Sequence, residues 1–450
     1  MSTRPDPSPT VHVLGGGPAG MAAAYYLQHQ FPVAVYEASE RLAGNCKTFE
    51  LEGFRYDSGA HRLHDKDPET TALFKSLLGK RLRLIHVPSQ IMYQGKRIDF
   101  PLSPVNLLRK LGPGVMLKAA GEIAAGRIRP QEINHFEDHA VQSYGRTLSQ
   151  KFLLEYSAKL WGVPTSKLAT EVAGGRLKGL DLKTMLIEAF RGQKGTHRHL
   201  DGSFYYPDLG IEVLFEALEK ASTNATFHTR APIQALHHEN GRITAITSAG
   251  QRVSVDGKVV SSLPLGPLIH MLDPAPSAAI LEAVQAVRFR NLVLAVFCLN
   301  KPAVNANGSM YFPEARYPFT RAYEPRNRSA DMSPEGKTSL IVEWPCQPED
   351  EVWQRDDTAI LSEIQSHLSQ IGLFTPAEVL HAKVERLPHA YPILSTDYAD
   401  TLAPVFRLLS DFSNLHLTGR NGLFQYSHIH DHMRNGRKAA KWASQTPLQH

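Results

Sequence analysis

Residues 11–20 read VHVLGGGPAG, and residues 33–37 read VAVYE. The first stretch predicts a short buried strand, a glycine-rich turn and the start of a helix built from small residues. The second predicts another buried strand that ends in an acidic residue. Strand, glycine turn, helix and acidic-ended strand together form the unit that binds dinucleotides. An ordinary β-turn-α unit without a nucleotide is the weaker alternative, because the motif stands in its full structural context.

The glycines of this turn have separate predicted tasks. Gly15 allows the tight turn, Gly17 lets a pyrophosphate approach the backbone, and Gly20 lets the helix pack closely on the strand. The helix start then offers free N–H groups and the positive end of its dipole to the phosphates. Glu37 follows Gly20 by 17 positions, near the roughly 20-residue spacing expected of a ribose-binding carboxylate. The turn alone does not distinguish NAD from FAD.

The residues that follow narrow the cofactor. Residues 41–48 read RLAGNCKT, and residues 53–62 read GFRYDSGAHR. Both resemble the FAD-binding signature of the amine oxidase and protoporphyrinogen oxidase-like flavoproteins, a superfamily that includes UDP-galactopyranose mutase. The resemblance implies that Glu37 binds the adenosine ribose, that the Arg-x-Gly-Gly turn passes the pyrophosphate, and that the Asp-x-Gly-x-His segment lies beside the isoalloxazine. Ala43 and Ala60 replace two glycines of the usual pattern, and alanine tolerates positive φ poorly.

More distant segments also resemble this superfamily. Residues 231–233 match the strand whose backbone meets the adenine, and residues 415–426 match the segment that closes the FAD site. A helix predicted from about 431 to 443 would direct its N-terminus at the flavin, where it would stabilise negative charge. The resemblance therefore implies that FAD contacts Gly15, Gly17, Pro18, Ala19, Gly20, Glu37, Arg41, Gly44, Asn45, Gly59, Ala60, His61, Arg62, Pro232, Ile233, Gly419, Arg420, His432 and Met433.

Four residues are candidates for the catalytic face of the flavin: His61, Arg62, Tyr391 and Tyr426. For His61 the alternative is a structural histidine bonded to the backbone, since buried histidines are common. The two tyrosines could equally be core aromatics with a satisfied hydroxyl.

The predicted fold class is α/β, a Rossmann-type FAD-binding domain with an interleaved α+β substrate domain. We expect a flexible tail at 1–10. We expect an FAD-binding domain assembled from 11–90, 200–270 and 405–450. The segments 91–199, which includes a helical part, and 271–404 would form the substrate domain. Smaller signals support this plan: an Asn240-Gly241 hairpin turn, a strand at 289–298, a helix at 357–371 and a family-like string at 176–180.

Composition sets broad limits. The chain has 450 residues, of which 42% are hydrophobic and 21% charged, as in soluble globular proteins. No apolar run approaches the roughly 18 residues of a membrane span. Three scattered cysteines favour a reducing, cytoplasmic setting without disulfides. The net charge of +5 is mild, and nothing resembles a nucleic-acid-binding arrangement.

Two features leave alternatives open. Residues 101–127 predict helices broken at Gly112-Pro113-Gly114, either as a lid over the substrate cavity or as an amphipathic surface in peripheral contact with a membrane. We favour the lid, because amphipathic helices usually pack on a core. His428, His430 and His432 alternate as metal ligands can, but flavin chemistry needs no metal, and we predict none.

The favoured function is that of an FAD-dependent oxidoreductase that transfers a hydride from a small-molecule substrate to flavin, in biosynthetic metabolism. The alternative is a mutase-like reaction on a nucleotide sugar without net redox change, because residues 59–64 and 419–426 resemble strings of UDP-galactopyranose mutase. Gln425 stands where that enzyme has a basic residue, and His428 and His430 stand where it has acidic ones. The oligomeric state is not predicted.

Overall fold

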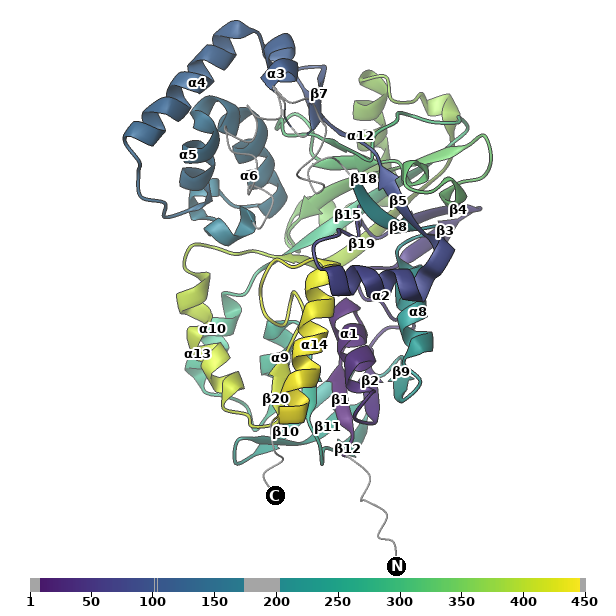
Figure 1. Cartoon of the computed structure of the whole chain (residues 1–450), viewed down its shortest axis with the longest axis vertical. Helices are drawn as coiled ribbons and strands as arrows, with labels where there is room; N and C mark the ends of the chain where they lie inside the picture. The colour runs from purple at the N-terminus through teal and green to yellow at the C-terminus, as the bar shows by residue number, and fades with distance from the viewer. Residues whose placement is uncertain (1–8, 101, 103, 174–202, 446–450) are drawn as a thin grey trace, which may run out of the picture.

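The computed structural model describes residues 9–100, 102, 104–173 and 203–445. The part drawn lowest in Figure 1 is built on a five-stranded parallel sheet of order β20-β13-β1-β2-β9. Its strands are β1 (Val11–Leu14), β2 (Val33–Tyr36), β9 (Ala225–His228), β13 (Val259–Ser261) and β20 (Leu415–Leu417). The strand, turn, helix and strand predicted from residues 11–37 are confirmed, with α1 (Pro18–Leu27) after the turn.

Helices from both ends of the chain cover this sheet. α14 (Ile429–Gln445) runs beside α1 (Figure 1). The two approach closely: a Cβ added at Gly436 would lie 2.7 Å from the backbone carbon of Ala22. α2 (Pro68–Leu78) packs against α8 (Glu212–Ala221), which also contacts α1. The predicted C-terminal helix is therefore confirmed, and it begins slightly earlier than expected.

A smaller sheet of order β12-β11-β10-β14 lies at the base of this part. Its strands are β10 (Ile233–Glu239), β11 (Arg242–Ser248), β12 (Gln251–Ser254) and β14 (Leu272–Asp273). The predicted hairpin joins β10 to β11, and Asn240 and Gly241 have φ of 49° and 70°, as a type I′ turn requires. α9 (Leu265–His270), α10 (Ala278–Gln285) and α13 (Tyr398–Ser410) complete this side.

The other large sheet has seven strands in the order β19-β15-β18-β17-β16-β6-β7. Its strands are β6 (Ser89–Tyr93), β7 (Lys96–Phe100), β15 (Phe289–Leu299), β16 (Ser309–Tyr311), β17 (Arg321–Tyr323), β18 (Thr338–Cys346) and β19 (Val379–Pro392). Every residue of β15 is buried, which explains the continuous apolar run from Leu292 to Leu299. α11 (Glu351–Gln354) and α12 (Asp357–Gln370) lie on this sheet, so the strand and helix predicted here are confirmed.

A helical layer stands beside the seven-stranded sheet (Figure 1). It contains α3 (Pro104–Leu111), α4 (Pro113–Ile128), α5 (Phe136–Ser149), a π-helical turn (Gln150–Leu154) and α6 (Glu155–Trp161). The predicted break at Gly112 separates α3 from α4. There are also two short antiparallel pairs: the hairpin of β3 (Thr48–Leu51) with β4 (Phe54–Asp57), and β5 (Leu82–His86) with β8 (Ser203–Pro207), which is distant in sequence. The family-like string at 176–180 and most of the predicted tail lie outside the described residues.

Candidate active site

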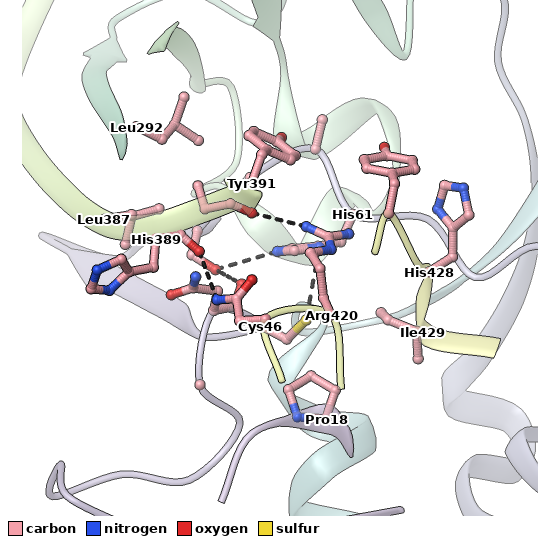
Figure 2. A pocket seen from close by; sticks show the side chains of 18 of the residues that line it. Pro18, Cys46, His61, Leu292, Leu387, His389, Tyr391, Arg420, His428 and Ile429 are labelled. Atoms are coloured by element: carbon pink, nitrogen blue, oxygen red, sulfur yellow. Dashed lines mark hydrogen bonds between the residues drawn. The ribbon is translucent and has the colours of Figure 1, made fainter. Parts of the chain in front are cut away.

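A cavity of about 840 Å³ extends from the glycine turn after β1 to the seven-stranded sheet and the helical layer. At one end it is lined by residues of the parallel sheet and its turns, and at the other by aromatic side chains. The two ends are one continuous space, so a molecule bound along the turn reaches the aromatic compartment. Figure 2 shows the middle of this cavity.

The turn end of the cavity is shaped by close glycine contacts. A Cβ at Gly44 would lie 3.0 Å from the Cα of Gly17, whereas a Cβ at Gly17 would meet only the Cα of Gly44, at 3.7 Å. Protein packing therefore does not require a glycine at position 17, and a side chain there would enter the cavity. Gly20 differs, because its Cβ would lie 1.8 Å from the carbonyl oxygen of Gly15. Gly15, Pro18 and Ala19 also line the cavity, and Gly20 packs the helix on the strand as predicted.

Glu37 lies at the end of β2 and lines the cavity. Its Oε2 accepts a hydrogen bond from the Gly16 N–H at 2.8 Å, and its Oε1 accepts one from the Ser39 N–H at 2.8 Å. These bonds fix the carboxylate beside the turn. The Ser39 hydroxyl also donates to Oε1 at 2.8 Å, so Oε2 is the oxygen that keeps a lone pair for a ligand donor.

Three predicted cofactor residues lie away from the cavity. Arg41 forms an ion pair with Glu212 and donates to the carbonyl oxygen of Thr48 at 2.8 Å. Pro232 has its carbonyl bonded by the Ala249 N–H at 3.1 Å, and only its neighbour Ile233 lines the space. Met433 is fully buried in the core beneath α1. These three residues do not line the cavity, so the contact predicted for Arg41 and the backbone contacts predicted for Pro232 and Met433 stay predictions. The other predicted cofactor residues, apart from Gly20, line the cavity.

The alanine at 43 has a visible structural consequence. Ala43 adopts φ of 72°, the left-handed conformation that a glycine would take without strain. It is buried, and its N–H bonds to the carbonyl oxygen of Gly16 at 2.9 Å. The turn thus keeps the backbone path of the usual pattern despite the substitution.

His61 is enclosed by neutral and cationic neighbours. Its Nε2 lies 3.3 Å from Ser58 Oγ and its Nδ1 lies 3.9 Å from Cys46 Sγ. Burial, and then the nearby guanidinium groups of Arg328 and Arg420, lower the pKa of His61 to about 3. The imidazole is therefore neutral at physiological pH. Burial likewise raises the pKa of Cys46 to about 12, so that side chain is a neutral thiol.

The guanidinium of Arg62 is held away from the centre of the cavity, although the residue lines it. It donates to Ser89 Oγ at 3.2 Å and to Ser309 Oγ at 3.1 Å, and it stacks 4.8 Å from the centre of the Phe204 ring. These contacts join β6, β8 and β16. Of the four catalytic candidates, Arg62 is therefore the one whose functional group is committed to the scaffold.

Tyr391 and Tyr426 stand together in the aromatic compartment. Their rings are stacked with centroids 6.3 Å apart, and the indole of Trp161 meets each edge-on at 5.9 Å. Arg420 lies against both tyrosines and donates to the carbonyl oxygen of Ala390 at 3.0 Å (Figure 2). The C-terminal segment is thereby tied to the end of β19. Burial raises the pKa of Tyr391, which keeps its phenol protonated.

An ion pair that the sequence did not predict forms the floor of this compartment. Arg321 donates through Nε and Nη2 to Glu343 at 2.8 Å each, and Glu343 also accepts from the Ala60 N–H at 2.9 Å. Burial lowers the pKa of Arg321, but the Glu343 carboxylate outweighs this effect and holds it well above its usual value. Arg321 lines the cavity, and among the described residues none bonds to its remaining nitrogen, Nη1. The pair links the segment beside His61 to the aromatic compartment.

The helix α14 begins at the cavity. His432, in its first turn, is buried and lines the space, and among the described residues its Nδ1 has no hydrogen-bond partner. Burial lowers its pKa to about 3. An unpartnered buried nitrogen is costly unless another group supplies the missing bond. His428 and His430 stack at 5.5 Å, and no cluster of metal-ligating side chains occurs in the described part of the chain.

The residues present fit an extended dinucleotide. The glycine cradle at Gly17 and Gly44, the carboxylate-bearing Glu37 and His432, whose Nδ1 lacks a partner among the described residues, all line the cavity. A parallel sheet with such a turn and helix start defines a dinucleotide-binding protein, and the continuous aromatic compartment defines an enzyme with a buried substrate site.

Comparison with known proteins identifies the family of dinucleotide-binding enzymes to which the chain belongs. Residues 18–441 match the family model for flavin containing amine oxidoreductases. The chain therefore belongs to this family and is an FAD-dependent oxidoreductase, as the sequence predicted.

Individual relatives are distant. Protoporphyrinogen oxidase 2 of Arabidopsis thaliana is 24% identical over 261 residues, 51% of each chain. The zeta-carotene-forming phytoene desaturase of Myxococcus xanthus is 22% identical over 421 residues, 83% of this chain and 79% of that protein. The chain spans about half or less of the plant protoporphyrinogen oxidases that it matches.

Two solved structures share the fold. Reduced UDP-galactopyranose mutase superposes with a TM-score of 0.84 at 20% identity, covering 98% of this chain and 97% of that one. A putative protoporphyrinogen oxidase from Exiguobacterium sp. 255-15 superposes with a TM-score of 0.75 at 20% identity, covering 96% and 98%. These similarities confirm the predicted fold class.

Proposed function

We propose that the protein oxidises a small amphiphilic molecule in the aromatic compartment, with an anionic group of the substrate held by Arg321. FAD, when bound, supplies the acceptor for a hydride from the substrate. The observation that carries the proposal is the continuity of the glycine cradle with a compartment walled by Trp161, Tyr391 and Tyr426. A substrate there would stack on aromatic faces, out of water and next to the cofactor.

Each part of the chain then has a task toward the cofactor. Gly17 and Gly44 would admit the pyrophosphate, Glu37 would accept hydrogen bonds from the ribose, and His432 would meet the flavin end at the start of α14. We infer that the parallel-sheet part holds FAD and that the seven-stranded sheet and helical layer hold the substrate. A biosynthetic role is part of the proposal and is supported only by the kinds of enzyme that the chain resembles.

In this proposal, His61 and the Arg321–Glu343 pair position the substrate and the segment beside the cofactor, and they do not transfer protons. His61 is neutral because of its lowered pKa, and its contacts with Ser58 and Cys46 fix the ring. Glu343 holds Arg321 on one side and the Ala60 N–H on the other. This connection sets the distance between the substrate anchor and the segment beside the cofactor, which hydride transfer requires to be short.

The test uses matched ligand pairs. Apolar carboxylic or phosphoric acids and their neutral esters are mixed anaerobically with the yellow holoprotein, and loss of flavin absorption is followed. We expect acids to bleach the flavin faster than their esters, and Arg321→Met to abolish this advantage while the protein keeps its flavin. Equal rates for acids and esters in the unaltered protein would contradict the anchoring role. Bleaching by no member of a broad panel would contradict the oxidation.

A second candidate function rests on the same arginine. A cation inside the compartment suits the diphosphate of a nucleotide sugar, as in a mutase without net redox change. Offering UDP-galactopyranose to anaerobically reduced protein separates the two. Conversion without net flavin oxidation favours the mutase, whereas turnover only with oxidised flavin and an electron acceptor favours the oxidoreductase.

A further inference from the structure

The outer face of α3 and α4 carries most of the exposed apolar side chains. Seven large hydrophobic residues are exposed among the described residues, and five of them lie between positions 105 and 133: Val105, Leu108, Leu117, Ile128 and Ile133. Leu117 and Ile128 are 77% and 79% exposed. From this concentration we propose that the face binds the surface of an anionic lipid bilayer.

The exposed residues of α4 form one straight stripe. Leu117, Gly121, Ala124 and Ile128 are all exposed, and they are spaced by four, three and four residues, which places them on one side of a helix over about three turns. Ala119 and Ile123, on the opposite side, are buried. The apolar stripe is therefore not the packing face of α4, which already lies against α5.

Basic residues flank the stripe on both sides. At about 100° per residue, Lys118 lies to one side of Leu117 and Arg127 to the other, and both are exposed, as is Arg129 at the end of the helix. Residues 104–133 contain five basic and two acidic side chains. One of the acids, Glu122, is turned inward and accepts hydrogen bonds from the N–H and the hydroxyl of Thr147 at 2.7 and 2.8 Å. An apolar strip between cations is the pattern of helices that lie in a bilayer interface.

Charge decides between a bilayer and a second copy of the chain. A symmetric contact between two copies would bring the flanking cations of both together, where they repel. Lipid phosphates would instead neutralise them, and the strip would enter the acyl boundary. Lys and Arg stems can extend from an apolar surface to the headgroups.

The position in the molecule fits this partner. α3 and α4 form the end of the molecule remote from the parallel sheet (Figure 1). Neither helix lines the cavity, whose helical wall comes instead from Phe136, Phe152, Leu153, Tyr156, Leu160 and Trp161 in the described residues. The favoured prediction of a lid at 101–127 is therefore wrong for α3 and α4. The core cluster beneath them shares Ile91 and Phe152 with the cavity wall, so the proposed lipid-facing surface backs directly onto the substrate compartment.

Vesicle sedimentation of the full holoprotein tests the proposal. The probes are vesicles of phosphatidylcholine alone and of phosphatidylcholine with phosphatidylglycerol. We expect binding to the anionic vesicles that weakens with salt and falls at least about tenfold in Leu117→Ser/Ile128→Ser, since both side chains lose burial. Lys118→Gln/Arg127→Gln should weaken anionic binding by about tenfold or more. Flavin content and melting temperature report that each variant is folded.

The matched control is Leu84→Ser/Leu380→Ser, which removes two exposed hydrophobics elsewhere and should leave vesicle binding unchanged. Three results would overturn the proposal. The first is no binding of the unaltered protein to anionic vesicles, and the second is an equal loss in the control variant. The third is a dimer that Leu117→Ser/Ile128→Ser dissociates while vesicles bind neither form, which would assign the face to a second copy.

Discussion

Replacing Glu343 by Gln tests whether the Arg321–Glu343 pair holds the two halves of the site together. Glu343 is 2% exposed, and the change leaves the guanidinium buried without its counter-charge. Breaking a buried pair on one side costs about 3–5 kcal/mol. With about 2.1 cal/mol/K of unfolding entropy per residue over 450 residues, each degree corresponds to about 1 kcal/mol. Glu343→Gln should therefore lower the melting temperature by roughly 3–5 °C.

The assay is calorimetry of the flavin-loaded protein beside two controls. Glu349→Gln breaks the exposed pair with Arg288, whose side chains are 55% and 58% exposed, and should shift the melting temperature by less than about 1 °C. Arg321→Met combined with Glu343→Leu removes both charges and should recover much of the loss. If Glu343→Gln melts like Glu349→Gln, the pair does not stabilise the fold and the reasoning fails.

Three further outcomes follow from the same geometry. Gly17→Val should fold normally but lose FAD, because its side chain enters the cavity rather than the protein; absorbance of the purified protein checks this, and retained flavin would refute the pyrophosphate role. Arg41→Gln should keep its flavin affinity, since Arg41 faces Glu212 outside the cavity; a large loss on flavin titration would restore the predicted contact. His432 has a pKa of about 3 when folded and 6.5 otherwise, so the unfolded chain takes up its proton first. The free energy of unfolding should therefore fall as pH drops from about 6.5 toward 3, and urea titrations should show a shallower fall in His432→Asn; an unchanged slope would contradict the burial of a neutral ring.

The fold could be predicted from local patterns because each decisive element carries its own signal. Residues 11–37 contain strand, turn and helix in one continuous stretch, and β15 reveals its burial through the uninterrupted apolar run from Leu292 to Leu299. The close approach of the chain at Gly17 and Gly44 could also be predicted, because glycine lacks a side chain that would block it.

The contacts that could not be predicted from the sequence join residues that lie far apart along the chain. Arg321 faces Glu343 only because β17 and β18 pair in a register that sets these residues opposite each other. Arg41 leaves the cofactor path because Glu212, 171 positions later, accepts its guanidinium. The amphipathic signal of residues 101–127 was detected, but which face is covered depends on where α5 packs, and no local pattern contains that information.

The parallel sheet has a consequence for how the protein is made. β1 needs β13 on one side, and β13 needs β20, which is formed by Leu415–Leu417. During synthesis β1 and its glycine turn are soon followed by their first partner, β2, but they leave the ribosome hundreds of residues before β13 and β20 do. The edge of β1 stays open through most of translation, and an open edge invites pairing with other chains. FAD uptake is then a late event that seals a nearly complete polypeptide, and a shortage of the vitamin precursor should appear in cells as aggregated chains rather than as folded, colourless enzyme.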